Sequence, residues 1–367
     1  MNEASAAGVL AAARSFILDD TQSSADLEEL ARRFFDSNHF NPGGVQILSF
    51  DFVPDKTNGR YTLNVTAQVQ TSLLAVTGRK FLPINISSSA VVTPAGPVEA
   101  VMVLDNTGSM SGQKLIDLKA AATSLTNTLL GSTTGRNSIG IVPFNRYVNV
   151  GPANLNEPWV STTLLPDPAV DPSFSWNGCV GSRSDPNNVE DSGFTSDPAI
   201  ALPDVSCPGP IVPLTKNKTT IINAINAMTA SAGTFIGPGL AWGQRVISDR
   251  TPFTEGLSES AIAAQAGVKA IILLTDGANT KSPSFPYHDL EVESEANLIT
   301  EHTCDEIKAD SIRIYTIAFD VTEPSIISLL QDCASNDGGF YSASDTATLN
   351  TVFNRIAVNL TDLALTD

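Results

Sequence analysis

Histidines and basic residues are scarce in this chain, and their scarcity narrows the range of functions. Lysine and arginine number 21 against 39 aspartates and glutamates, so the formal net charge is −18. A surface of that sign repels phosphate backbones and argues against nucleic-acid binding. The three histidines, His39, His288 and His302, form no His-Glu-x-x-His motif, and we expect them at surface or structural positions. No run approaches the roughly 18 apolar residues of a membrane-spanning helix.

Cysteine is equally rare. None of the four cysteines lies in a Cys-x-x-Cys or similar short spacing, which argues against a zinc site. An even number allows complete pairing, with three possible connectivities. We predict that neighbours in the sequence pair, Cys179 with Cys207 and Cys304 with Cys333, in an oxidising compartment. The alternative is four inert thiols buried in the core.

The first 97 residues are expected to form a small α+β region. An Ala-rich stretch over residues 3–18 predicts a helix, and Ser23 or Ser24 is placed to cap a second one. The hydrophobic period then changes from about 3.6 residues to about 2, which predicts three antiparallel strands with one face available to the helices. The predicted strands are Val45–Val53, Tyr61–Val76 and Leu82–Val92.

From Val98 to the end, short apolar strands alternate with amphipathic helices. Glu99–Leu104 and Val268–Thr275 have the composition of buried parallel strands. The alternation predicts the α/β class, with a doubly wound and mostly parallel sheet in a domain over residues 98–367. The other predicted strands are Ser138–Val142, Ile312–Phe319 and Gly339–Tyr341, with Tyr147–Val150 as a hairpin partner, and the predicted helices are Leu115–Leu130, Thr219–Met228, Pro238–Ser248, Glu291–Lys308, Ser325–Cys333 and Ala347–Leu360.

Residues 151–215 interrupt this alternation. They hold 11 of the 22 prolines together with Cys179 and Cys207, and we interpret them as an irregular insertion closed on itself by a disulfide. Several polar residues here could bind Ca²⁺, but their spacing is not that of an EF-hand, so a solvated acidic loop is favoured. These residues are Asp185, Asn187, Glu190, Asp191 and Asp197.

Three loops beside the predicted sheet carry side-chain oxygens. Asp105, Thr107 and Ser109 follow the first strand of the domain, Thr234 precedes a helix, and Asp276 follows Val268–Thr275. Counting chain directions brings the three loops to the edge at which open α/β sheets bind ligands. Oxygen donors without imidazole or thiolate favour Mg²⁺, or else Mn²⁺ or Ca²⁺, with water or a partner completing the coordination. Taken singly, each loop is more typical of a helix cap or a turn than of a metal site.

This order of motifs resembles the von Willebrand factor A family from about Val98 to the end of the chain. The family's Asp-x-Ser-x-Ser motif, threonine loop and Asp-Gly turn form a metal-ion-dependent adhesion site. The resemblance implies that Asp105, Thr107, Ser109, Thr234 and Asp276 hold the cation, with a partner carboxylate in the open position. Thr107 stands where the family commonly has serine.

The Ala-rich start, the small β region, the sequence DNTGSM and the Cys304/Cys333 pair also resemble TadG-like (TadE/TadG) proteins of bacterial Tad (Flp) pilus assembly. That resemblance implies an extracytoplasmic protein, anchored by a membrane helix expected just before Asn2. Its partner would be a pilus component or a surface ligand that offers a carboxylate.

The sequence therefore predicts an adhesion or protein-binding module rather than an enzyme. One alternative is a metal-dependent hydrolase, although the three loops offer no His or Glu as a general base. Another is a cytoplasmic partner of a motor ATPase, which reduced cysteines would favour. The segment Gly108–Gly112 is not a nucleophile elbow, because Met110 takes its central position, and residues 233–239 lack the Gly-Lys of a phosphate loop.

Overall fold

The chain divides into two compact units, a smaller one before Gly96 and a larger one from Gly96 onward. The computed structural model describes residues 1–18, 22–39, 45–55, 59–70, 80–91, 96–131, 135–167, 169–335 and 338–363.

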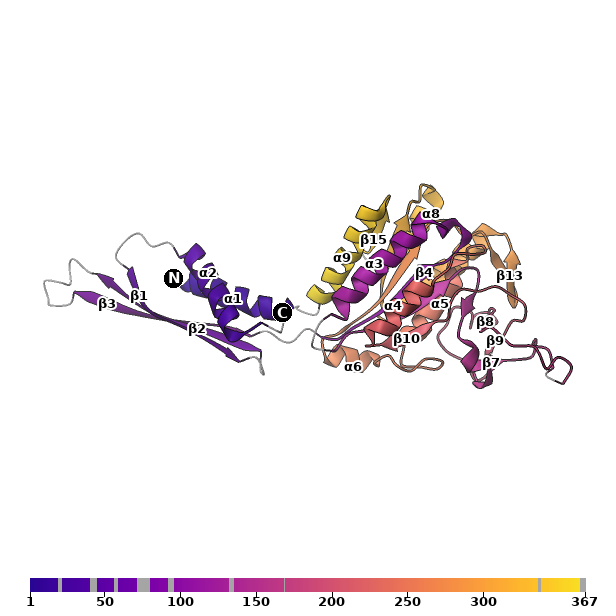
Figure 1. Ribbon diagram of the computed structural model, residues 1–367, viewed down its shortest axis with the longest axis horizontal. Helices are drawn as coiled ribbons and strands as arrows, with labels where there is room; N and C mark the ends of the chain where they lie inside the picture. Colours follow the sequence, from indigo (N-terminus) through magenta and orange to yellow (C-terminus); the bar gives the residue numbers. More distant parts are fainter. Residues whose placement is uncertain are drawn as a thin grey trace. The chain divides into compact units, whose positions relative to one another are not determined.

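The smaller unit packs two helices on one face of a three-stranded antiparallel sheet of order β1-β2-β3 (Figure 1). Of the two serines considered, Ser23 caps α2, in a reciprocal capping box with Asp26. A side chain at Gly8 of α1 would place its Cβ 2.6 Å from the carbonyl oxygen of Ala31 in α2, so glycine permits the close approach of the two helices. The elements are α1 (Asn2–Leu18), α2 (Ser24–Asn38), β1 (Val45–Asp55), β2 (Arg60–Gln70) and β3 (Phe81–Val91).

The predicted strand over residues 61–76 ends as β2 at Gln70, and its residues 71–76 lie outside the described part of the chain. Among the described residues, no helix is long and apolar enough to cross a membrane.

Five parallel strands form the centre of the larger unit, in the order β15-β14-β11-β4-β5. The mixed α/β class and the mostly parallel sheet are confirmed. From β4 the chain moves to β5 on one side and later returns to β11 on the other, so the strand order reverses between β4 and β11. A crevice forms at the carboxyl ends of strands where such a reversal occurs. The strands are β4 (Val98–Asp105), β5 (Ser138–Phe144), β11 (Val268–Thr275), β14 (Arg313–Phe319) and β15 (Phe340–Ala343).

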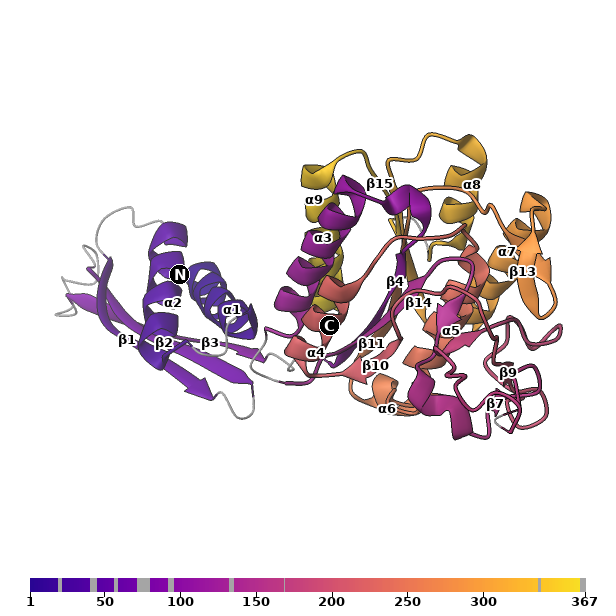
Figure 2. The ribbon, with the colours of Figure 1, turned by 45° about the vertical axis from the view of Figure 1, so that its right-hand side comes forward.

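Helices cover both faces of this sheet (Figure 2). Val101 and Val103 of β4 face a core shared with α5, α7 and α8, whereas Met102 and Leu104 face a core shared with α3, α4 and α9. The short α6 is not predicted from the sequence, while the predicted helices differ from the observed ones by only a few residues at their ends. The helices are α3 (Gln113–Leu129), α4 (Lys218–Ala227), α5 (Ile236–Ile247), α6 (Glu259–Ala264), α7 (Glu293–Ala309), α8 (Pro324–Cys333) and α9 (Thr346–Leu363), with a 3-10 turn η2 (Gly108–Met110).

Residues 151–215 contribute to the core of the larger unit and are not merely an irregular loop closed on itself. Trp159, Trp176 and Phe194 are buried in the core that α5 covers. The ring centroids of Trp159 and Trp242, on α5, lie 6.2 Å apart. Short strands here and nearby escaped prediction because they are only two to four residues long. They are β7 (Val160–Ser161), β8 (Cys179–Val180), β9 (Ala199–Ile200), β10 (Val212–Thr215), β12 (Ser282–Ser284) and β13 (Tyr287–Leu290). The hairpin partner predicted over Tyr147–Val150 is present as β6 (Val148–Asn149), antiparallel to β5, and a 3-10 turn η3 (Pro152–Asn156) follows it.

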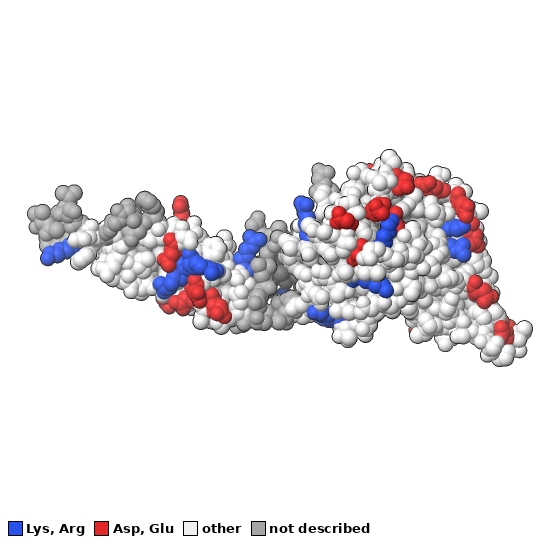
Figure 3. All heavy atoms as spheres, turned by 45° about the horizontal axis from the view of Figure 1, so that its top comes forward, with Lys and Arg blue, Asp and Glu red and all other residues white. Residues whose placement is uncertain are grey.

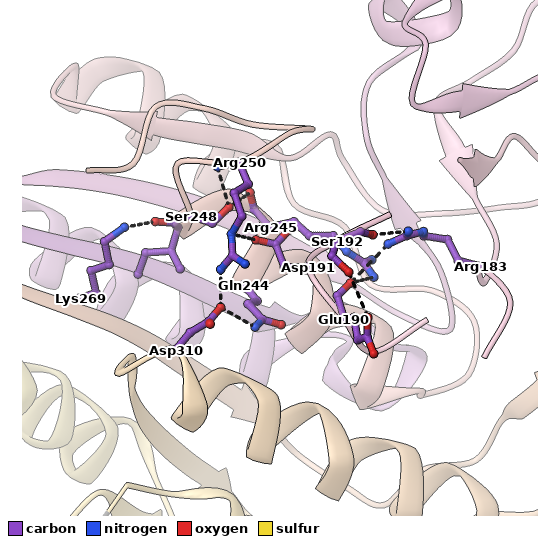
Figure 4. A network of polar contacts seen from close by, with 11 residues as sticks. Arg183, Glu190, Asp191, Ser192, Gln244, Arg245, Ser248, Arg250, Lys269 and Asp310 are labelled. Carbon is purple, nitrogen blue, oxygen red and sulfur yellow. Dashed lines mark hydrogen bonds and ion pairs between the residues drawn. The ribbon is translucent and has the colours of Figure 1, made fainter. Parts of the chain in front are cut away.

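Two buried arginines hold the backbone of this segment (Figure 4). Arg183 and Arg245 are only 2% and 3% exposed. Buried guanidinium groups require acceptors, and backbone carbonyl groups of the segment provide them, at the place where the sequence suggested a Ca²⁺ site or a solvated loop. Asp191, which those readings treated as a surface acid, is itself buried. The accepting oxygens are those of Glu190, Ser192 and Asp197 for Arg183, and of Asn187, Asn188 and Glu190 for Arg245.

Two disulfides join the cysteines as neighbours in the sequence. Cys179 pairs with Cys207 inside the 151–215 segment, and Cys304 of α7 pairs with Cys333 at the end of α8. The second bond ties together two helices that cover the same face of the sheet, and both of its cysteines are buried.

Replacing both Cys304 and Cys333 by alanine should lower the free energy of unfolding by about 3–4 kcal/mol, because the crosslink restricts the unfolded chain. Denaturant unfolding followed by circular dichroism measures this loss. Reductant should destabilise the wild type more than the double variant, which has a single disulfide left to lose. Mass spectrometry of a non-reduced digest is the independent check, and a crossed pairing or four alkylatable thiols would contradict the prediction.

Candidate metal-binding site at the sheet edge

Parallel pairing brings the first acid of the site to the end of β11. Leu104 of β4 pairs with Leu274 of β11, so the next residues, Asp105 and Thr275, end their strands side by side. The Asp105 side chain is completely buried. One of its oxygens accepts the backbone N–H of Thr107 at 2.8 Å and the other accepts the Thr275 hydroxyl at 2.6 Å. These bonds fix the orientation of the carboxylate.

A hydroxyl relay continues from this point to the second acid. The Oγ atoms of Thr107 and Ser109 lie 2.9 Å apart, and the Ser109 hydroxyl donates to Oδ1 of Asp276 at 2.7 Å. Thr107 is buried, as is the Asp276 carboxylate, whereas Ser109 is exposed. Four of the five proposed site residues therefore form one hydrogen-bonded set that opens to solvent at Ser109.

The fifth residue, Thr234, lies on a loop bound to both neighbouring loops. The backbone N–H of Gly108 donates to the carbonyl oxygen of Ala232 at 2.9 Å. The backbone N–H of Thr234 donates to the Thr280 hydroxyl at 2.8 Å, and its carbonyl oxygen accepts the N–H groups of Thr280 and Lys281. Thr234 is buried between the β4 and β11 loops. These contacts fix its loop between the two loops that carry the acids, although its hydroxyl is not hydrogen-bonded to either acid.

Three contributors were missed by sequence reasoning. Lys114, in the first turn of α3, places its Nζ 3.0 Å from Oδ2 of Asp276 and 3.2 Å from Oδ2 of Asp320. Asp320 directly follows β14, the strand next to β11, so an acid ending a buried strand was an available signal. Thr275, the last residue of β11, gave no signal because it reads equally well as an ordinary strand residue.

The set gathers more acidic than basic side chains in a largely buried place. Burial raises the pKa of Asp105 to about 6, although the hydrogen bonds from Thr107 and Thr275 act in the opposite direction. Buried carboxylates are costly unless positive charge or hydrogen bonds compensate them. Here the ammonium group of Lys114 lies beside Asp276 and Asp320, while Asp105 accepts hydrogen bonds from Thr107 and Thr275.

The donor chemistry suits a hard divalent cation. Carboxylate and hydroxyl oxygens are the ligands that Mg²⁺ and Ca²⁺ prefer, and Mg²⁺ usually keeps several waters. Within the described ranges, no three His, Cys, Asp or Glu side chains gather as a metal-binding group. A cation here would therefore depend on hydroxyls and water as well as on the acids. Figure 3 shows further Asp and Glu side chains along one margin of the larger unit, a field that attracts cations.

A serine–histidine pair elsewhere in the unit bears on the hydrolase alternative. Oγ of Ser182 lies 2.6 Å from Nε2 of His288, whose Nδ1 contacts the carbonyl oxygen of Arg146. His288 is 1% exposed and stacks on Tyr147 with ring centroids 4.9 Å apart. The adjoining cavity holds about 20 Å³, enough for a water molecule but not for a substrate. The pair therefore serves to join the 151–215 segment to β13, as expected for a structural histidine.

Comparisons with known proteins found structural likeness only. No protein-family profile and no curated protein matches the chain. Among solved structures, the von Willebrand factor domain of the type V pili tip protein Mfa5 from Porphyromonas gingivalis has 14% identity and a TM-score of 0.47, with 76% of this chain and 98% of that chain covered. The pilus adhesin SpaC from Lactobacillus rhamnosus GG has 13% identity, a TM-score of 0.46, and coverage of 88% and 35%.

A third similar structure is the pilus adhesin RrgA from Streptococcus pneumoniae, with 14% identity, a TM-score of 0.41, and coverage of 88% of this chain and 50% of that chain. The chain thus spans about a third of the SpaC chain and half of the RrgA chain. At these scores the likeness concerns the arrangement of elements, and function has to be argued from the residues of this chain.

The buried histidine makes stability depend on pH. Burial lowers the pKa of His288 from 6.5 to about 4, so the unfolded chain takes up this proton at a higher pH than the folded chain. Above pH 7 His288 should have no effect, and between about pH 6.5 and pH 4 the free energy of unfolding should fall by up to about 3 kcal/mol on its account. Denaturant titrations across this range measure the fall.

Two variants distinguish the effect of His288 on stability from the effect of carboxylates that titrate in the same pH range. His288→Gln has no imidazole and should lose less stability between pH 6.5 and 4.5 than the wild type. His302→Gln, at an exposed position of α7, should retain the wild-type dependence. Equal slopes for wild type and His288→Gln would refute the assignment.

Proposed function

We propose that the larger unit is a von Willebrand factor A-type domain that binds a divalent cation, Mg²⁺ foremost, and through it an anionic group of a protein partner. The observation that carries the proposal is the hydrogen-bonded set of Asp105, Thr107, Ser109 and Asp276 at the carboxyl ends of β4 and β11. The loop of Thr234 packs against this set. These are the five positions at which the chain resembles the family's adhesion site.

Each residue has a distinct part in the proposed site. The hydroxyls of Thr107 and Ser109 would contact the cation, and Asp105, Asp276 and Thr234 would hold it directly or through water. The bound cation supplies positive charge at the open side of the site. Ser109 marks that side, because it is exposed while Asp105 and Thr107 are buried. A partner carboxylate reaching this side would complete the coordination and tighten cation binding.

The proposed setting is an extracytoplasmic surface. Two disulfides suit an oxidising compartment, and they disfavour the alternative of a cytoplasmic ATPase partner. The resemblance of the first 97 residues to TadG-like proteins leads us to propose a pilus-assembly role with a membrane anchor preceding Asn2. Binding is proposed rather than catalysis, because the acids are engaged in the cation site and the three loops offer no general base.

Asp105→Asn and Asp276→Asn should each weaken Mg²⁺ binding by about 10–100-fold or more, because each removes a charge from the site while keeping the size of the side chain. Titration calorimetry with Mg²⁺, Mn²⁺ and Ca²⁺ measures the affinity. Both variants should fold, since the site lies outside the two hydrophobic cores.

Asp204→Asn is the matched control. Asp204 is exposed and has a φ of 53°, a conformation that asparagine tolerates, so the change removes one charge with little strain. Its cation affinity should equal that of the wild type. Equal binding by wild type and Asp105→Asn would place any cation elsewhere.

A further inference from the structure

The positively charged side chain of Lys114 lies in the acidic site, paired with Asp276 and Asp320. We propose that its ammonium group neutralises Asp276 in the absence of metal, and that it moves toward Asp320 when a divalent cation binds. The cation thus exchanges with Lys114 and does not enter a vacant charge cluster. This inference rests on the proposed function and adds to it a residue pair that sets the cation affinity.

Both oxygens of Asp276 are engaged by the chain itself. Oδ1 accepts the Ser109 hydroxyl at 2.7 Å, and Oδ2 accepts the Lys114 ammonium at 3.0 Å. The Asp276 side chain is 0% exposed, so water contributes little to the stabilisation of its charge. In the cation-free protein, the positive charge of Lys114 therefore replaces solvent as the stabilising partner.

A divalent cation and the ammonium group cannot share this carboxylate without strong repulsion. Two positive charges within a few ångströms, in surroundings where Asp105 and Asp276 are both buried, are poorly screened. Cation binding must therefore move the Lys114 ammonium away from Asp276. The side chain has room to move, because it is 28% exposed.

Asp320 provides the second position for Lys114. Its Oδ2 lies 3.2 Å from the same Nζ, and its side chain is 56% exposed, so this carboxylate can hold the ammonium at the solvent side. The backbone of Asp320 is fixed at a φ of 56°, with its N–H donating to the carbonyl oxygen of Ala343 at 2.7 Å. Lysine can therefore leave Asp276 and still keep an ion pair, which lowers the cost of the exchange.

Lys114→Met tests the exchange, since methionine keeps much of the side-chain length without the charge. The variant should bind Mg²⁺ roughly tenfold more tightly than the wild type by calorimetry, because no ammonium opposes the cation. In EDTA it should melt at a lower temperature than the wild type, and Mg²⁺ should raise its melting temperature by more. Lys216→Met is the control: Lys216 is exposed in the turn between β10 and α4, and its removal changes net charge equally.

Asp320→Asn gives an independent test that keeps Lys114. In the wild-type background Asp320→Asn should weaken Mg²⁺ binding, because Lys114 loses its alternative partner. In the Lys114→Met background the same substitution should weaken Mg²⁺ binding less. If Lys114→Met fails to fold, this variant and the shift of the Lys114 side-chain NMR signal on Mg²⁺ addition decide the matter. An unmoved signal in a protein that binds Mg²⁺ would overturn the inference.

The outcomes separate the inference from the function on which it rests. Equal Mg²⁺ affinity of the wild type and Lys114→Met, with Asp105→Asn impaired, overturns the exchange but leaves the cation site standing. No Mg²⁺ binding by either protein overturns both.

Discussion

The parallel register of β4 with β11 is the constraint on which the arrangement of the two buried acids depends. Because Leu104 pairs with Leu274, Asp105 and Thr275 reach the sheet edge together, and Asp276 follows within one residue. Two carboxylates are thereby buried close to one another, an arrangement that is unfavourable by itself. Hydrogen bonds and one positive charge reduce this cost. The hydrogen bonds come from the hydroxyls of Thr107, Thr275 and Ser109, and the positive charge is the ammonium group of Lys114. The loop chemistry therefore follows from the strand pairing.

The same problem of buried charge recurs elsewhere in the larger unit, and the chain's few basic residues are placed to meet it. Lys269 of β11 forms a buried ion pair at 3.2 Å with Glu99 of β4. Arg250 contacts the carboxylate of Asp191 at 3.3 Å, and burial raises the pKa of Asp191 to about 6. The buried guanidinium groups of Arg183 and Arg245 donate to backbone carbonyl groups of the 151–215 segment (Figure 4). Among the described residues three basic side chains are buried, against five acids: Arg183, Arg245 and Lys269, against Glu99, Asp105, Asp117, Asp191 and Asp276.

Those features that depend on local pattern were predictable from the sequence. The strand Val268–Thr275 has the predicted bounds, since a continuous apolar run records burial on both faces directly. The motif Asp105–Ser109 and the Asp276 turn could be assigned to one edge because strand direction alone fixes that edge. By contrast, β10 is four residues long and owes its strand conformation to antiparallel pairing with β5. Tertiary contacts of that kind leave no periodic signal.

Lys114 shows the same limit within the site. Its ion pair joins residues 162 positions apart, and nothing around Lys114 distinguishes it from an exposed helical lysine. Asp320 was easier to predict from the sequence. It directly follows a buried strand, and the same signal identified Asp105 as a site residue. Likewise, the sequence did not predict that aromatic residues of the 151–215 segment are buried in the core. Prolines and very short strands leave this segment without a hydrophobic periodicity from which burial could be predicted. The sequence therefore identified the donors of the site better than the groups that balance their charge.

Net charge and site geometry together bear on how such a domain could select a partner. An acidic surface repels an acidic partner at a distance, and this repulsion is screened by salt. At the sheet edge the repulsion would reverse only while a divalent cation is bound, because Lys114 alone leaves Asp105, Asp276 and Asp320 with excess negative charge. A cation that must first exchange with Lys114 would be held weakly without a partner and more tightly with one. Under the proposed function, attachment would then require cation and carboxylate together, and neither would bind strongly by itself.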